Sequence, residues 1–227
     1  MSMSMRELGI EAETGLHVSG LMQVPARARA CYVLAHGAGA GMAHPFIAAV
    51  AQGLFERGIA SLRYQFPYME RGSRRPDAPP LAHATVRAAV AEAARQLPGL
   101  ALFAGGKSFG GRMTSQAQAQ SPLPGVRGLV FIGFPLHPAG KPSVQRAAHL
   151  ADIIVPMLFL QGTRDDLAQL ELLQPTVARL GSRATLELFE HADHAFHVPA
   201  RSGRKDTQVM GELLDRTAEW VGAVLDG

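Results

Sequence analysis

The segment Gly106-Lys107-Ser108-Phe109-Gly110 matches the pattern G-x-S-x-G, which typically turns a strand sharply into a helix. Glycines two residues before and after the serine leave room for the backbone to approach itself closely. The serine hydroxyl then projects above the sheet at a helix N-terminus, where free N–H groups favour developing negative charge. The pattern therefore predicts that Ser108 is a nucleophile. In a glycine-rich chain the same letters also arise by chance, as a turn with an incidental serine.

A serine hydroxyl is a weak nucleophile at neutral pH, so Ser108 needs a general base, and the base needs an orienting carboxylate. With this type of turn the acid and then the histidine follow the serine in sequence, at the carboxyl ends of parallel strands. Asp165 follows the apolar run 157–160, whereas Asp152 precedes it and falls at the wrong end. We therefore predict Asp165 as the acid. Asp166 remains an alternative, and a helix N-cap is the purely structural role for Asp165.

Three histidines follow the last expected strand, in the segment HADHAFH at residues 191–197. We predict His194 as the base, because it is clear of the strand and precedes the small Ala195 and the anchoring Phe196. His191 is the alternative. Asp193 adjoins His194 in sequence, so we do not expect its side chain to reach across and orient the ring.

Acyl transfer also requires N–H groups that stabilise an oxyanion. One is expected from Phe109, directly after the nucleophile, and the other from Ala38 or Gly39 in the loop that follows residues 30–35. The glycines and alanines of this loop lack the Lys-Ser/Thr ending of a phosphate-binding loop and fit the dinucleotide fingerprint poorly. No cysteine or second histidine cluster completes a metal site with the histidines of residues 191–197. Neither a cofactor nor a metal is expected.

The elements that must position these residues alternate along the chain. Short apolar runs predict strands at residues 30–35, 59–64, 100–104, 126–131, 157–160 and 184–189. Helical patterns cover residues 45–57, 81–97, 112–120, 167–180 and 206–225. This order predicts a mostly parallel sheet with helices on both faces, in a single domain spanning residues 1–227. Residues 16–24 add an early strand in an N-terminal hairpin, and residues 65–80 form a long loop.

Composition narrows the class of protein. The chain has 227 residues, 47% of them apolar, with no run near the ~20 apolar residues that span a bilayer. Residues 1–15 show no signal-peptide pattern, and the lone Cys31, an expected core residue, fits a reducing compartment. The net charge of +3 comes from scattered arginines without a nucleic-acid-binding motif. We expect a cytoplasmic protein with no nucleic-acid or membrane partner.

The segments LAHGAGAGMAHPF, LRYQFPYME, FAGGKSFGGRM, FLQGTRDDL and HADHAFHVP together resemble the compact α/β-hydrolases related to dienelactone hydrolases, from about residue 30 to residue 221. The nearest branch includes the hydrolase-like subunit of a histone-acetyltransferase complex and testis-expressed relatives. The resemblance implies an α/β-hydrolase fold and the triad Ser108, Asp165 and His194. Dienelactone hydrolases carry a cysteine where this chain has Ser108, so their substrate does not carry over.

We therefore predict a serine hydrolase that cleaves small carboxylic esters or thioesters through an acyl-enzyme. A peptidase or amidase with the same triad is one alternative, and a non-enzymatic interaction module that keeps the fold is another. Residues 133–156 are too few for a cap domain, which predicts an open pocket and a preference for short acyl chains.

Positive charge in the sequence also bears on the substrate. Arg71, Arg74 and Arg75 lie in the long loop, and Lys107 and Arg112 flank the serine. If the loop folds over the pocket, the mouth is positive and attracts anionic substrates. If it does not, these arginines only face solvent.

Overall fold

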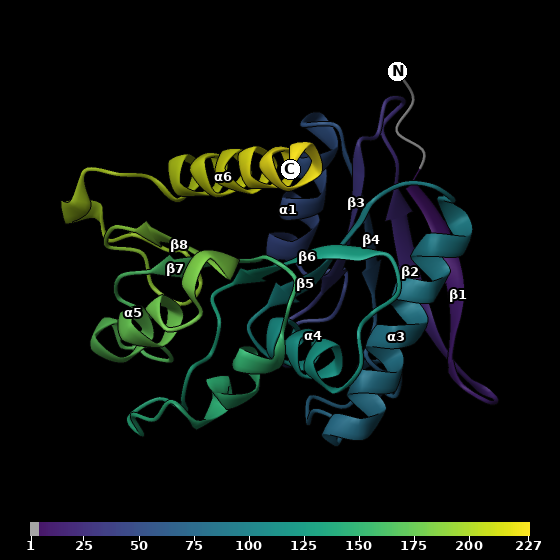
Figure 1. Cartoon of the computed structure of the whole chain (residues 1–227), viewed down its shortest axis with the longest axis horizontal. Coiled ribbons are helices and arrows are strands. Elements are labelled where there is room, and N and C mark those ends of the chain that lie inside the picture. Colours follow the sequence, from purple (N-terminus) through teal and green to yellow (C-terminus); the bar gives the residue numbers. More distant parts are fainter. Residues whose placement is uncertain (1–4) are drawn as a thin grey trace.

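Eight strands form one sheet in the order β1-β2-β4-β3-β5-β6-β7-β8, in a computed structural model that describes residues 5–227 (Figure 1). Strands β1 and β2 form an antiparallel hairpin, and β2 pairs antiparallel with β4. The other neighbours in the sheet, along β4-β3-β5-β6-β7-β8, all pair in parallel. The bounds are β1 Met5–Glu13, β2 Leu16–Gln23, β3 Ala30–Ala35, β4 Ile59–Tyr64, β5 Leu102–Lys107, β6 Val126–Ile132, β7 Met157–Gly162 and β8 Ala184–Phe189. Residues 1–4, where the segment assessed for a signal peptide begins, lie outside the described part.

Helices cover both faces of the sheet. Helices α1 and α6 lie together on one face, and α3 and α4 lie together on the other (Figure 1). The bounds are α1 Pro45–Glu56, α2 Pro67–Glu70, α3 Pro79–Gln96, α4 Phe109–Gln120, α5 Leu170–Ala178 and α6 Asp206–Asp226. Short 3₁₀ helices occupy Gln145–Asp152, Gly181–Arg183 and Ala200–Ser202. No helix of residues 5–227 combines the length and the apolar character needed to cross a membrane.

The alternation of side chains along β3 divides the core into two layers. Tyr32 and Leu34 point into the layer under α1 and α6, while Val33 and Ala35 point into the layer under α3 and α4. Every residue of β3 is buried, as expected for a central parallel strand covered on both faces. Cys31 lies in the second layer, and burial raises the pKa of its thiol to about 12. It is therefore an inert core residue.

The predicted elements are present, with boundary shifts that matter near Ser108. Strand β5 extends to Lys107 and α4 begins at Phe109, so strand and helix meet directly at the serine. The region 65–80, predicted as loop, contains the short helix α2 and the start of α3, each beginning with proline, a favourable first helical residue. Helix α5 is shorter than predicted. Between β6 and β7 there is only the 3₁₀ helix Gln145–Asp152, so no cap domain covers the sheet there.

Candidate active site

Ser108 stands at the turn between β5 and α4 in a strained backbone conformation. Its φ of 51° and ψ of −116° lie in a region that residues with a side chain rarely adopt. The Ser108 N–H donates to the Ile132 carbonyl at 3.1 Å, which ties the turn to the end of β6. Strain of this kind is maintained where the surrounding structure enforces it, and it is typical of a serine held out for reaction.

The two glycines of the motif are required by close backbone contacts. A Cβ on Gly106 would lie 2.2 Å from the Ala35 carbonyl oxygen, and a Cβ on Gly110 would lie 2.5 Å from that of His36. Gly106 also has a φ of 147°, which is unfavourable for any other residue. The spacing G-x-S-x-G thus follows from the way that β5 and α4 pack against the end of β3.

Replacing Gly106 by alanine is expected to destabilise the fold by about 3 kcal/mol, because the new methyl group collides with backbone and the φ angle is strained. The melting temperature should fall by roughly 10 °C, measured by circular dichroism. Gly211 in α6 is the matched control, because a Cβ there meets no atom within 4 Å. Gly211→Ala should raise stability slightly. Equal melting temperatures for Gly106→Ala and the unmodified protein would contradict this packing.

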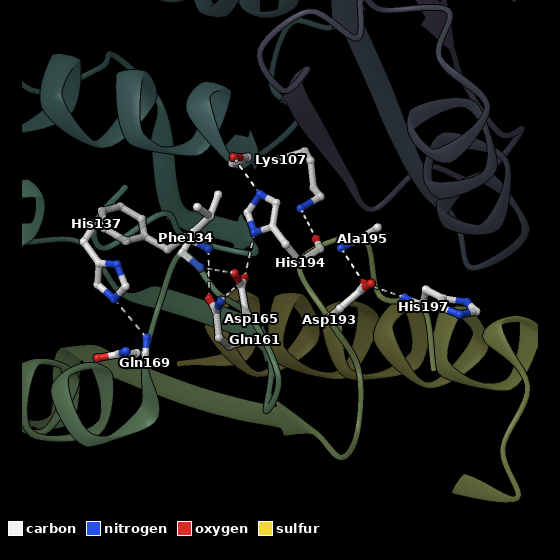
Figure 2. A network of polar contacts seen from close by, with 12 residues as sticks. Lys107, Phe134, His137, Gln161, Asp165, Gln169, Asp193, His194, Ala195 and His197 are labelled. Atoms are coloured by element: carbon white, nitrogen blue, oxygen red, sulfur yellow. Dashed lines mark hydrogen bonds and ion pairs between the residues drawn. The ribbon is translucent and has the colours of Figure 1, made fainter. Parts of the chain in front are cut away.

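Ser108, His194 and Asp165 form one hydrogen-bonded chain. His194 Nε2 lies 2.8 Å from Ser108 Oγ. His194 Nδ1 lies 2.7 Å from Asp165 Oδ2 (Figure 2). The Asp165 side chain is fully buried, whereas 28% of the His194 side chain is exposed. The three residues come from the ends of β5, β7 and β8, which meet at the same edge of the sheet. This arrangement can transfer a proton from the serine to the histidine and stabilise the resulting cation.

Two further groups hold the Asp165 carboxylate in place. Gln161 donates to Asp165 Oδ2 at 2.5 Å, and the Leu167 N–H donates to Oδ1 at 2.8 Å. Gln161 is itself oriented by the Phe134 N–H, which donates to its amide oxygen at 2.9 Å (Figure 2). The Leu167 contact is a turn contact and not the helix N-cap considered from the sequence, because α5 begins at Leu170 and its N-cap is Gln169. Gln161 was not singled out from the sequence, because nothing in the strand pattern marks its side chain as an orienting group.

The alternative candidates for the acid and the base, Asp166 and His191, have side chains that do not hydrogen-bond to Ser108, Asp165 or His194. Asp166 is exposed and makes no hydrogen bond to a histidine among residues 5–227. His191 is exposed, with its N–H bonded to Thr163 Oγ1. His197 is also exposed, and its Nδ1 bonds Asp206 at 2.8 Å. Among the described residues, no three of the His, Cys, Asp and Glu side chains are grouped as metal ligands.

Asp193 shapes the loop that carries His194. Its carboxylate accepts the N–H groups of Ala195 at 2.8 Å and His197 at 2.9 Å, which curls the backbone around it (Figure 2). Gly162 lets this loop come close to β7, because a Cβ there would lie 2.3 Å from the Ala192 carbonyl oxygen. From its sequence position Asp193 could be excluded as the orienting acid, but its contacts within the loop could not be predicted.

Lys107 binds the same loop through the backbone of His194. Its Nζ donates to the His194 carbonyl oxygen (Figure 2). The same Nζ lies 5.6 Å from the centre of the Phe196 ring. Burial lowers the pKa of Lys107 to about 8, and the Asp165 and Asp193 carboxylates oppose this shift. The lysine is thus engaged within the site, in contrast to the sequence-based expectation that it adds free positive charge at the pocket mouth.

The expected oxyanion donors lie beside Ser108 but differ in their availability. The N–H groups of Phe109 and Ala38 have no hydrogen-bond acceptor among residues 5–227. The Gly39 N–H donates to the Tyr68 hydroxyl at 3.2 Å, so Ala38 is the better candidate of the two. The buried His36 fixes this loop: its Nε2 accepts the Phe66 N–H at 3.1 Å, and burial lowers its pKa to about 4.

Two cavities adjoin the serine. The first, of about 490 Å³, is largely apolar, with Phe46, Ile47 and Ala195 beside Lys107 and His194. The second, of about 510 Å³, lies toward the loop before α3 and is lined in part by prolines. Ser108 lines both, so a carbonyl held at its hydroxyl can place one substituent in each. Volumes of this size suit small organic ligands.

The arginines expected at the mouth of the pocket do not form one positively charged patch there. Arg71 pairs with Asp77 at 2.5 Å, while Arg74 and Arg75 are exposed and line neither cavity. Pro76, Asp77 and Pro79 of the same region do line the second cavity, so the loop borders the pocket without presenting its arginines there. Of the basic residues that flank Ser108 in sequence, only Arg112 reaches the second cavity.

Solved structures with this fold cover almost the entire chain. Dienelactone hydrolase from Anabaena variabilis is 18% identical, with a TM-score of 0.79 and 97% of each chain covered. A serine hydrolase without lid from Xanthomonas campestris is 20% identical, with a TM-score of 0.75, covering 97% of this chain and 96% of that one. The esterase domain of a Rhodothermus marinus protein is 16% identical, with a TM-score of 0.73, covering 96% and 98%.

These likenesses agree with the cap-less, mostly parallel architecture predicted from the sequence. The family described as the alpha/beta hydrolase domain matches residues 28–222. This range includes Ser108, Asp165 and His194. The protein is therefore a member of the alpha/beta hydrolase family.

Proposed function

We propose that this chain hydrolyses small carboxylic esters or thioesters through an acyl-enzyme on Ser108. The observation that carries the proposal is the chain of two short hydrogen bonds from Ser108 Oγ through His194 to the buried Asp165, at a strained turn beside two cavities. The esterase and dienelactone hydrolase among the similar structures support this class of reaction.

In the proposed reaction, Ser108 Oγ attacks the carbonyl carbon while His194 Nε2 accepts its proton. The negative charge that forms on the carbonyl oxygen is stabilised by the N–H groups of Phe109 and Ala38. His194 then protonates the leaving oxygen or sulfur, the bond to the leaving group breaks, and an ester of Ser108 remains. Water, deprotonated by His194, attacks this ester and releases the acid. Asp165 orients the ring and stabilises its cationic form throughout.

The remaining expectations belong to the same proposal. The lone, buried Cys31 favours a cytoplasmic location. The site needs no cofactor, and we expect no nucleic-acid or membrane partner. Kinship with the branch of the histone-acetyltransferase subunit and the testis-expressed proteins rests on the sequence motifs alone. An amidase or peptidase would use the same residues and differ only in the leaving group.

Acyl chain length is expected to limit turnover. Without a cap domain, the distal methylenes of a long chain stay in water and contribute no binding energy. 4-Nitrophenyl butyrate should therefore be hydrolysed with a higher kcat/KM than the palmitate ester, with no activation at a lipid interface. Initial rates over a panel of esters, thioesters and anilides measure both chain length and leaving-group class.

Ser108→Ala is the control for every substrate in that panel. Faster hydrolysis of palmitate than of butyrate would contradict the open-pocket account. Faster turnover of anilides than of esters would favour the amidase alternative. No turnover of any substrate, in a protein that is folded by circular dichroism, would favour a non-enzymatic module.

A further inference from the structure

The two cavities beside Ser108 are separate spaces that share a border. Ala38, Ser108 and Leu167 line both of them, so the border lies where a substrate carbonyl would be attacked. An ester bound there has its acyl part on one side and its alcohol part on the other. The residues that line only one cavity therefore decide which half of the substrate it accepts.

The position of His194 indicates which half of the substrate lies in which cavity. His194 lines the first cavity and not the second. Because this residue must protonate the leaving group, the alcohol or thiol part has to lie within its reach, in the first cavity. The acyl part then extends into the second cavity, past Phe109 and toward the segment after β6.

The second cavity contains two arginines without partners. Arg112 and Arg146 both line it, and neither makes an ion pair or a side-chain hydrogen bond with residues 5–227. Arg112 Nε is buried and has no acceptor. Burial and then the charge of Arg146 lower the pKa of Arg112, so the two guanidinium groups repel each other. Both side chains are partly exposed, and an anion bound between them would relieve this repulsion.

Other ionisable groups nearby do not neutralise this pair. Asp77 also lines the cavity, but its carboxylate already accepts Arg71 at 2.5 Å and the Tyr68 N–H at 2.8 Å. His149 lies outside the lining of this cavity, and burial and then the charge of Arg112 lower its pKa to about 4, so it is neutral. The cavity therefore keeps a net positive charge.

We propose that Arg112 and Arg146 bind a carboxylate at the far end of the acyl group, so that the preferred substrates are monoesters or monothioesters of dicarboxylic acids. This inference rests on the proposed hydrolase function and specifies its substrate class. The rest of the lining suits the spacer between the two carbonyl groups, because it is mainly apolar: Pro76, Pro79, Pro135, Pro138, Ala139 and Leu167. A guanidinium matches the planar geometry of a carboxylate and holds it through paired hydrogen bonds.

The test compares two esters of nearly equal shape. Mono-4-nitrophenyl glutarate carries the carboxylate, and 4-nitrophenyl 5-oxohexanoate replaces it with a methyl ketone. After the uncatalysed rates are subtracted, kcat/KM for the glutarate should be about tenfold or more above that for the ketone. In Arg112→Gln and Arg146→Gln this ratio should fall about tenfold, and Arg112→Lys should recover only part of it.

Arg75→Gln is the matched control, because it removes the same charge from an exposed residue that lines neither cavity. It should leave the ratio unchanged. The ketone ester serves as an internal standard for folding, since a damaged site lowers both rates together. A ratio near one in the unmodified protein, or a ratio that survives both glutamine substitutions, would overturn the proposal.

Binding to Ser108→Ala separates this inference from the proposed function. By calorimetry, Ser108→Ala should bind the glutarate ester more tightly than the ketone ester, and adding Arg112→Gln should abolish the difference. Absence of hydrolysis by the unmodified protein, with this binding preference intact, would reject the hydrolase but keep the anion site. Turnover of both esters with equal binding would reject the anion site alone.

Discussion

Ser108→Ala is expected to lower kcat for 4-nitrophenyl butyrate by about 10⁶-fold, to a residual rate supported by the oxyanion donors and by substrate binding. The reason is that the hydroxyl held at 2.8 Å from His194 Nε2 is the only group at the turn that can form the acyl-enzyme. Alanine keeps the Cβ and removes only the hydroxyl, so the strained turn is retained. Steady-state rates and a thermal melt, which should be unchanged within a few degrees, measure the two effects separately.

Retention of more than a small percentage of the rate by Ser108→Ala would contradict the account. A large loss of rate together with a collapsed melting curve would instead point to a structural role for the serine. Ser115→Ala is a suitable comparison, because Ser115 Oγ also contacts a histidine, His149 Nε2, at 2.7 Å. That serine is fully buried in α4 and adjoins no cavity that contains Ser108. Its replacement should not affect the chemical step.

His194→Ala should also lower kcat by about 10⁶-fold. Only this ring contacts both Ser108 and Asp165, at 2.8 and 2.7 Å. His191→Ala and His197→Ala are matched controls from the same loop, since both side chains are exposed and neither contacts Ser108. Each control should retain the rate within about threefold.

An inactive His191→Ala beside an active His194→Ala would show that the functional loop has a different register from the one described here. Imidazole added to His194→Ala provides a further check, because the cavity left by the ring opens onto the first pocket. Partial recovery of rate with added imidazole would indicate that the ring acts by transferring protons and does more than fill space.

The sequence was sufficient to predict the elements that meet at this site, since each leaves a local signal. Central strands are short apolar runs, and the glycines around Ser108 are required by contacts of the turn itself. The order serine, acid, histidine then restricts the candidates to residues that follow strands. Asp165 and His194 could be separated from Asp166 and His191 only by position relative to a strand end, an argument that depends on exact register.

Side-chain contacts between distant segments were not predictable in this way. Lys107 lies beside Ser108 in sequence, which suggested a cation at the mouth, yet it bonds the carbonyl of His194, 87 positions away. Arg146 comes from a segment with no recognisable motif and meets Arg112 only because the 3₁₀ helix packs against α4. Arg74 and Arg75, which appeared more promising in sequence, face solvent because their loop approaches the pocket through its prolines.

The most direct test of the central claim is covalent labelling by a fluorophosphonate at neutral pH, followed by intact mass and peptide mapping. Only a serine with an activated hydroxyl reacts readily with this reagent. We expect one adduct per chain, located on Ser108, absent from Ser108→Ala and strongly slowed in His194→Ala. An adduct on Ser115 or any other serine of the unmodified protein, or undiminished labelling of Ser108→Ala, would contradict the assignment of Ser108 as the nucleophile.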